Sequence, residues 1–225
     1  QIEELERNNN ISAEKAQEII KNLSQLTDLD KTNDKERKNG IKPQSIHDTV
    51  RILKRIVDLN ITGGSVNILG PANNILDGRN KKSWQNLTNN TIISDLMMTL
   101  ENFTFQYADY LKYNPNASRN FTYENLQVHV KYIKQPGNVS MEERTLTFPN
   151  ASFNLSSDAL SKTSGTKVAV IWYKKTHLFI SNSFNGRPAI YGGVNSDIIT
   201  ASVRPTPEPK QFEEPVRMTW NIMEK

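Results

Sequence analysis

The spacing of apolar residues divides the chain into a first part with a helical period and a second part with a strand period. In the first part apolar residues recur at the spacing of a helix with one buried face. After Asn114-Pro115 they alternate with polar residues, which is typical of a half-buried strand. Helices followed by strands favour an α+β fold over alternating α/β units. We therefore predict an N-terminal helical subdomain at residues 1–115 and an antiparallel β-sandwich subdomain at residues 116–225, with the boundary near 112–122.

Three long helices are predicted before the period changes. The first is capped by Ser12 and is followed by a charged loop, Lys31 to Lys38. The second opens at Ser45-Ile-His-Asp48, which resembles a capping box, and ends at Gly63-Gly64. The third starts near Thr91. The expected buried positions are, in turn, Ala16, Ile19, Ile20, Leu23 and Leu26; Ile46, Val50, Leu53, Ile56 and Val57; and Ile93, Leu96, Met97, Leu100, Phe103, Tyr107 and Leu111.

Polar residues occupy the opposite faces of the first and third helices. They are Lys15, Glu18, Asn22 and Gln25 in the first, and Asp95, Thr99, Asn102, Gln106 and Asp109 in the third. Between the second and third helices, Gly70-Pro71 interrupts an apolar stretch that runs from Val66 to Leu76. Trp84 follows as an isolated large aromatic residue, which is expected to anchor a loop on the helices, with a binding hot spot as the alternative.

The second part of the chain predicts a series of short strands. Leu126, Val128, Val130 and Tyr132 alternate with Gln127, His129 and Lys131, which predicts one half-buried strand. Further strands are expected around Leu146–Phe148, Ala151–Leu155, Ile198–Val203 and Val216–Asn221, with a central strand at Lys167–Tyr173 and a helical turn at Ser156–Leu160. Pro205, Pro207 and Pro209 predict a rigid loop. Consecutive strands are expected to pair in an antiparallel manner.

Eleven of the 26 asparagines begin an Asn-x-Ser/Thr triplet without proline, where the 34 Ser and Thr residues would give roughly four by chance. Such triplets accept N-glycans in the secretory pathway, and only on the protein surface. They are Asn10, Asn22, Asn60, Asn86, Asn89, Asn102, Asn116, Asn120, Asn138, Asn150 and Asn154. We place Asn22 and Asn102 on polar helical faces, Asn150 and Asn154 on the outer face of one strand, and Asn60, Asn116, Asn120 and Asn138 at element ends or in loops. The excess predicts an extracellular chain.

Composition excludes several functional classes. The net charge of +4 is small, and the basic residues of the segment Lys31 to Lys38 have acids interspersed, so no nucleic-acid partner is expected. The longest strongly apolar run, Val168-Ala-Val-Ile-Trp172, is too short to span a membrane. His47, His129 and His177 lack metal-ligand spacing, so no metal is expected and each is interpreted as structural or exposed. No cysteine, nucleophile elbow or phosphate-loop spacing occurs, and we expect no catalytic residue and no cofactor.

Several segments together resemble the GAIN domain of adhesion G-protein-coupled receptors, and two of them, Val194 to Val203 and Glu214 to Thr219, are most similar to the latrophilin branch. Asn74-Ile-Leu-Asp-Gly-Arg-Asn-Lys-Lys-Ser-Trp84 and the helical Leu96-Met-Met-Thr-Leu-Glu-Asn-Phe103 are similar to its helical subdomain A. Val168-Ala-Val-Ile-Trp-Tyr-Lys174, Val194-Asn-Ser-Asp-Ile-Ile-Thr-Ala-Ser-Val203 and Glu214-Pro-Val-Arg-Met-Thr219 are similar to strands of its subdomain B.

The resemblance implies a domain that holds a tethered-agonist strand and couples adhesion or mechanical force to signalling across a membrane. In the family, the GPS motif with its cysteines and self-cleaving tripeptide is expected beyond Lys225, so the autoproteolysis is assigned to no residue here. The implied partners are the GPS/tethered-agonist segment of the same membrane-spanning receptor and an extracellular protein ligand. Without that segment, an apolar groove and an unpaired sheet edge are expected. A secreted glycoprotein module that binds protein or glycan, and a glycan-processing enzyme, are the alternatives.

Overall fold

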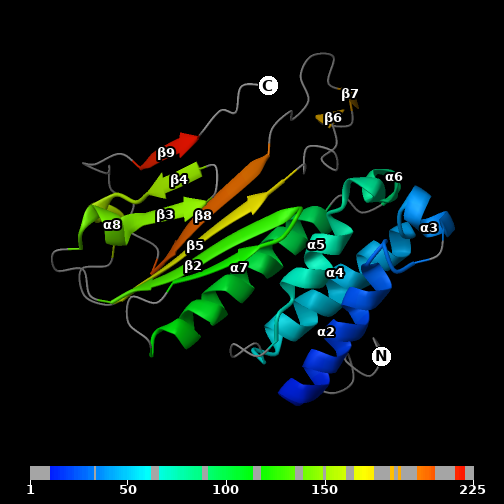
Figure 1. Cartoon of the computed structure of the whole chain (residues 1–225), viewed down its shortest axis with the longest axis horizontal. Helices are drawn as coiled ribbons and strands as arrows, with labels where there is room; N and C mark the ends of the chain where they lie inside the picture. The colour runs from blue at the N-terminus through cyan, green and yellow to red at the C-terminus, as the bar shows by residue number, and fades with distance from the viewer. Residues whose placement is uncertain are drawn as a thin grey trace. The chain divides into compact units, whose positions relative to one another are not determined.

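The computed structural model describes residues 11–32, 34–61, 66–87, 91–113, 118–134, 139–148, 151–160, 165–174, 183–184, 187–188, 197–205 and 216–220. An N-terminal helical region is followed by antiparallel strands in two sheets, which confirms the α+β prediction (Figure 1). The chain forms two compact units. The first, here called the helical unit, comprises 1–103, 123–126 and 172–199; the second, the two-sheet unit, comprises 104–122, 127–171 and 200–225.

The helices follow one another in the first half of the sequence. They are α2 (Ala13–Thr27), α3 (Asp34–Asn39), α4 (Pro43–Asp58), α5 (Leu69–Ile75), the 3-10 helix η1 (Gly78–Asn80), α6 (Lys81–Gln85) and α7 (Ile92–Leu111). The first helix begins as predicted, because the Ser12 hydroxyl accepts a hydrogen bond from the Lys15 amide at 3.2 Å. Leu26 is nevertheless 70% exposed, and Thr27 is buried in its place. The buried row continues from Leu23 by four residues, which leads to position 27 rather than 26.

Helix α4 begins earlier than the predicted capping box. Its first residue is Pro43, and Lys42 at the N-cap provides no side-chain hydrogen bond. Proline suits this position because its fixed φ is helical and its missing N–H would lack a partner there anyway. The helix ends at Asp58 and is followed by Asn60 with a φ of 53°, so Gly63-Gly64, which lie outside the described residues, do not end it. The predicted buried positions of α4 are all buried.

Two further segments differ from the prediction. The expected charged loop contains the start of helix α3, whose polar sequence gave no apolar period to detect. Gly70 and Pro71 do not interrupt the next apolar stretch but lie in the first turn of α5, where proline is tolerated. Helix α7 covers the predicted third helix, yet Thr99 is buried although it was placed on the polar face. Its hydroxyl is satisfied by the Asp95 carbonyl oxygen at 2.7 Å.

The described strands form two larger sheets and a hairpin. The four-stranded sheet has the order β1 (Ser118–Thr122), β2 (Leu126–Ile133), β5 (Thr166–Tyr173), β8 (Ile198–Arg204). The three-stranded sheet has the order β3 (Thr145–Phe148), β4 (Ala151–Asn154), β9 (Arg217–Trp220). The hairpin joins β6 (Ser183–Phe184) and β7 (Arg187–Pro188), and the short helices α8 (Met141–Arg144) and η2 (Ser157–Ala159) lie between strands.

The pairing of strands follows sequence order only in part. Neighbours β1 and β2, and neighbours β3 and β4, pair in an antiparallel manner as expected. The chain then passes between the two sheets. In the first sheet β2 lies beside β5, and in the second β4 pairs with β9. The central position of Lys167–Tyr173 and the helical turn after Ser156 are confirmed. Strand β1 was not predicted, because its only large apolar residue is Phe121.

Within the two-sheet unit, the four-stranded sheet has packing on both faces (Figure 1). On one face the rings of Phe121 and Tyr107 of α7 meet edge to face with centroids 5.2 Å apart. On the other face the ring of His129 meets Phe148 of β3 at 6.1 Å. Strand β2 is therefore buried on both sides, and the prediction of a half-buried strand with Gln127 and His129 in water is wrong.

Candidate functional site

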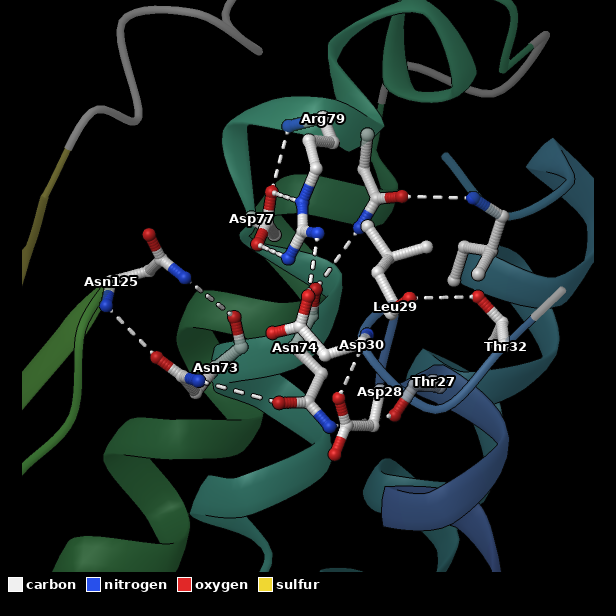
Figure 2. A network of polar contacts seen from close by, with 12 residues as sticks. Thr27, Asp28, Leu29, Asp30, Thr32, Asn73, Asn74, Asp77, Arg79 and Asn125 are labelled. Carbon is white, nitrogen blue, oxygen red and sulfur yellow. Dashed lines mark hydrogen bonds and ion pairs between the residues drawn. The ribbon is translucent and has the colours of Figure 1, made fainter. Parts of the chain in front are cut away.

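The segment that carried the first resemblance, Asn74 to Trp84, is held by a network of polar contacts inside the helical unit (Figure 2). Asn80 is completely buried, and its side chain accepts a hydrogen bond from the Ile41 amide at 2.9 Å and donates one to the Asn74 carbonyl oxygen at 3.0 Å. The indole N–H of Trp84 donates to the Ile75 carbonyl oxygen at 2.7 Å. Trp84 is 6% exposed, so it is an anchor in helix α6 and not a surface hot spot.

The same network includes ion pairs between charged side chains. Arg79 forms ion pairs with Asp77 at 2.8 Å and with Asp30 at 2.9 Å. The hydrogen bond and the charge of Arg79 lower the pKa of Asp30. Asn73 reaches the turn between β1 and β2, where its side-chain oxygen accepts from the Asn125 amide at 2.9 Å (Figure 2). All these polar atoms are used in holding the fold, so the motif is structural.

Two polar side chains lie buried between the sheets of the two-sheet unit. Neither ring nitrogen of His129 nor the side-chain oxygen of Gln127 has a hydrogen-bond partner among the described residues. Burial lowers the pKa of His129 to about 4, the backbone of Thr147 acts in the opposite direction, and the charge of Lys131 lowers it further. His129 is thus a buried structural residue, not an exposed one, and is neutral at physiological pH. The alternation of Gln127, His129 and Lys131 with apolar residues gave no sign of this two-sided burial.

The sheets expose edges at which a further strand can add. In the three-stranded sheet, β9 pairs only with β4 among the described strands. Val216 and Met218 on this segment are partly exposed apolar residues. In the four-stranded sheet β8 is an outer strand, and its last residue, Arg204, lies over the ring of Phe105 with the guanidinium carbon 4.1 Å from the ring centroid. The expected apolar groove stays a prediction.

The predicted N-glycosylation sites fall into three groups. Asn60, Asn86 and Asn120 are exposed, and Asn22, Asn102 and Asn154 are half-buried. Asn10, Asn89, Asn116, Asn138 and Asn150 lie outside the described residues. The prediction that Asn120 lies at an element end or in a loop is wrong, because Asn120 is in the middle of strand β1.

Other sequence expectations concern metals and membranes. His47 lies in the first turns of α4 with its Nδ1 3.5 Å from Asp48, and His177 lies outside the described residues. No cluster of metal-binding side chains occurs in the described ranges. In the same ranges, none of the helices has the length and apolar character needed to span a bilayer.

The fold defines an α+β protein in which a helical region is followed by two antiparallel sheets. Residues 117–225 match the family model described as GPS, GAIN subdomain B, and the match includes both larger sheets. This part of the chain belongs to the GAIN subdomain B family, which confirms the resemblance to the GAIN domain of adhesion G-protein-coupled receptors. GAIN domains are extracellular parts of adhesion receptors, and the family is not one of ordinary enzymes. No curated protein matches the chain.

Proposed function

We propose that this chain is the extracellular GAIN-type domain of a latrophilin-like adhesion G-protein-coupled receptor, and that it holds the receptor's tethered-agonist strand. The observation that carries the proposal is the match of residues 117–225 to GAIN subdomain B. A strand bound by backbone hydrogen bonds and apolar contacts can be released by force. Such a domain can therefore couple adhesion or mechanical pull to signalling across the membrane.

The outer edge of β9 is where we place the tethered strand. This edge has no strand partner among the described residues, and Val216 and Met218 offer apolar surface beside it. Addition of a strand to such an edge gains main-chain hydrogen bonds, while apolar side chains provide specificity. The N-glycosylation triplets support this placement, since all eleven precede residue 155 and none lies in the segments of β8 and β9.

The extension of the gene beyond Lys225 provides the first test. The proposal expects a Cys- and Trp-rich stretch followed by seven membrane spans. A stop codon at that point would instead favour the alternative, a secreted glycoprotein module that binds protein or glycan.

Hydrogen exchange provides a sharper test of the strand site. The amides of Arg217 to Thr219 are compared in this chain and in the same chain extended through the following segment. The extension should raise their protection by at least about tenfold, while the β1 edge amides stay unchanged. Met218→Lys should weaken this protection, whereas Met98→Lys, which changes another exposed methionine on helix α7, should not. Equal exchange in the two chains would exclude β9 as the docking edge.

A further inference from the structure

Among the described strands, β1 is the end strand of the four-stranded sheet, and the backbone groups at its outer edge can be assigned to particular residues. Its pairing with β2 runs without interruption from Ser118 opposite Lys131 to Thr122 opposite Gln127. At the adjoining turn, the Tyr123 amide donates to the Leu126 carbonyl oxygen at 2.9 Å.

Antiparallel pairs alternate between hydrogen-bonded and non-hydrogen-bonded pairs. Because the pair at Tyr123 is hydrogen-bonded, Ser118, Asn120 and Thr122 belong to non-hydrogen-bonded pairs. Their N–H and C=O groups therefore point away from β2, and Asn120 is at the centre of this outward-pointing set.

The same residues form an N-glycosylation triplet, Asn120-Phe-Thr122. Asn120 and Thr122 are exposed, whereas Phe121 between them is half-buried against Tyr107. The contact of Phe121 with helix α7 fixes the strand in position and leaves the acceptor side chain in solvent. The acceptor asparagine thus lies where a partner strand would have to approach.

Open strand edges invite pairing with another chain, and proteins normally block them with charges, prolines or bulges. Strand β1 has few of these devices. It has no proline, its register with β2 has no bulge, and Arg119 is its only charged residue. Two copies could pair antiparallel about a two-fold axis close to Asn120, which would bring the two asparagines together.

We propose that Asn120 carries an N-linked glycan that covers the β1 edge and prevents a second copy of this chain from pairing with it. The inference rests on the proposed extracellular function, because N-glycans are attached only in the secretory pathway. A glycan on each copy would occupy the two-fold contact and exclude the dimer.

The test uses the full chain secreted from a eukaryotic host. Glycopeptide mass spectrometry measures occupancy at Asn120, and sedimentation velocity over a range of concentrations measures self-association. Asn120→Gln and Thr122→Ala remove the triplet in different ways, while Thr122→Ser keeps it. Asn86→Gln is the matched control, since it removes a triplet whose asparagine is exposed just after helix α6.

Wild type, Thr122→Ser and Asn86→Gln should stay monomeric, and Asn120→Gln and Thr122→Ala should dimerise as concentration rises. Asn120→Lys lacks the glycan but puts a charge on the edge, so it should restore the monomer. Circular dichroism of each variant should match the wild type, so that association is not due to unfolding.

An unoccupied Asn120 beside occupied Asn60 or Asn86 would overturn this inference and leave the proposed function standing. Absence of glycan at every triplet would overturn both. If the wild type carries a glycan at Asn120 and the folded Asn120→Gln variant is still monomeric, the protective role of the glycan is overturned.

Discussion

Acid should destabilise the two-sheet unit through His129. Its side chain is 6% exposed between the sheets, and burial lowers the pKa from 6.5 to about 4. The unfolded chain therefore binds a proton near pH 6.5, whereas the native protein resists doing so until about pH 4. The contribution of neutral His129 to stability is present above pH 6.5, is lost as the pH falls through this window, and does not change further below about pH 4.

The size of this effect follows from the displacement of the pKa. At 1.36 kcal/mol per unit, the full displacement corresponds to roughly 3 kcal/mol, of which about 2 kcal/mol is lost by pH 5. The charged groups near the ring act in different directions. Lys131 on the same strand lowers the pKa of His129. Burial in turn lowers the pKa of Lys131, and Glu143 and Glu142 of helix α8 act in the opposite direction on it.

Urea unfolding at half-unit steps between pH 7.5 and pH 5 measures the effect. His129→Leu should remove most of the decline in unfolding free energy over this range, because leucine does not titrate. His47→Gln is the control and should retain the decline, since His47 lies outside the sheets. Parallel curves for wild type and His129→Leu would refute the reasoning and show that the ring is hydrated or paired in solution.

Four further substitutions test the core and the polar network, each by urea unfolding at pH 7.5. Leu100→Ala should cost about 2–5 kcal/mol because its side chain is fully buried, and Val170→Ala should cost less; near-wild-type stability would mean that the core is assigned wrongly. Asn80→Ala should cost roughly 2–4 kcal/mol, since it leaves the Ile41 amide without its acceptor; a neutral effect would show that water replaces the side chain. Gly40→Ala should cost at least about 1–2 kcal/mol, because φ is +80° and the added Cβ would lie 2.6 Å from the Arg79 carbonyl oxygen; an unchanged midpoint would contradict this backbone geometry.

Segments with a regular spacing of apolar residues were predictable from sequence, because that spacing marks the buried face of a single helix or strand. The buried row of α4 was found in this way, as were strands β2, β3, β4 and β5. In α7 the predicted Leu96, Leu100, Phe103 and Leu111 are buried, whereas Ile93, Met97 and Tyr107 are only half-buried. Elements with few apolar residues were not predictable in this way. Helix α3 has no apolar residue and β1 has Phe121 as its one large apolar residue, so neither shows a period; β1 is formed by its pairing with β2.

The candidate site shows the same division. The N-glycosylation triplets could be listed from sequence, because the recognition requirement is local. Their structural setting could not, and Asn120 was misplaced because the strand that contains it depends on pairing with β2. The burial of Gln127 and His129 was missed for a related reason, since the residue that covers His129 is Phe148 of a different sheet.

The sequence by itself determined the order of the long helices and of most strands, most of the inward face of helices α2 and α4, and the positions of the N-glycosylation triplets. These properties follow from the period of a single segment or from a triplet of neighbours. Tertiary structure decided which strands share a sheet, which faces are covered twice and which edges stay open. Those properties depend on contacts between segments far apart in the chain, such as β4 with β9, and no local pattern encodes them.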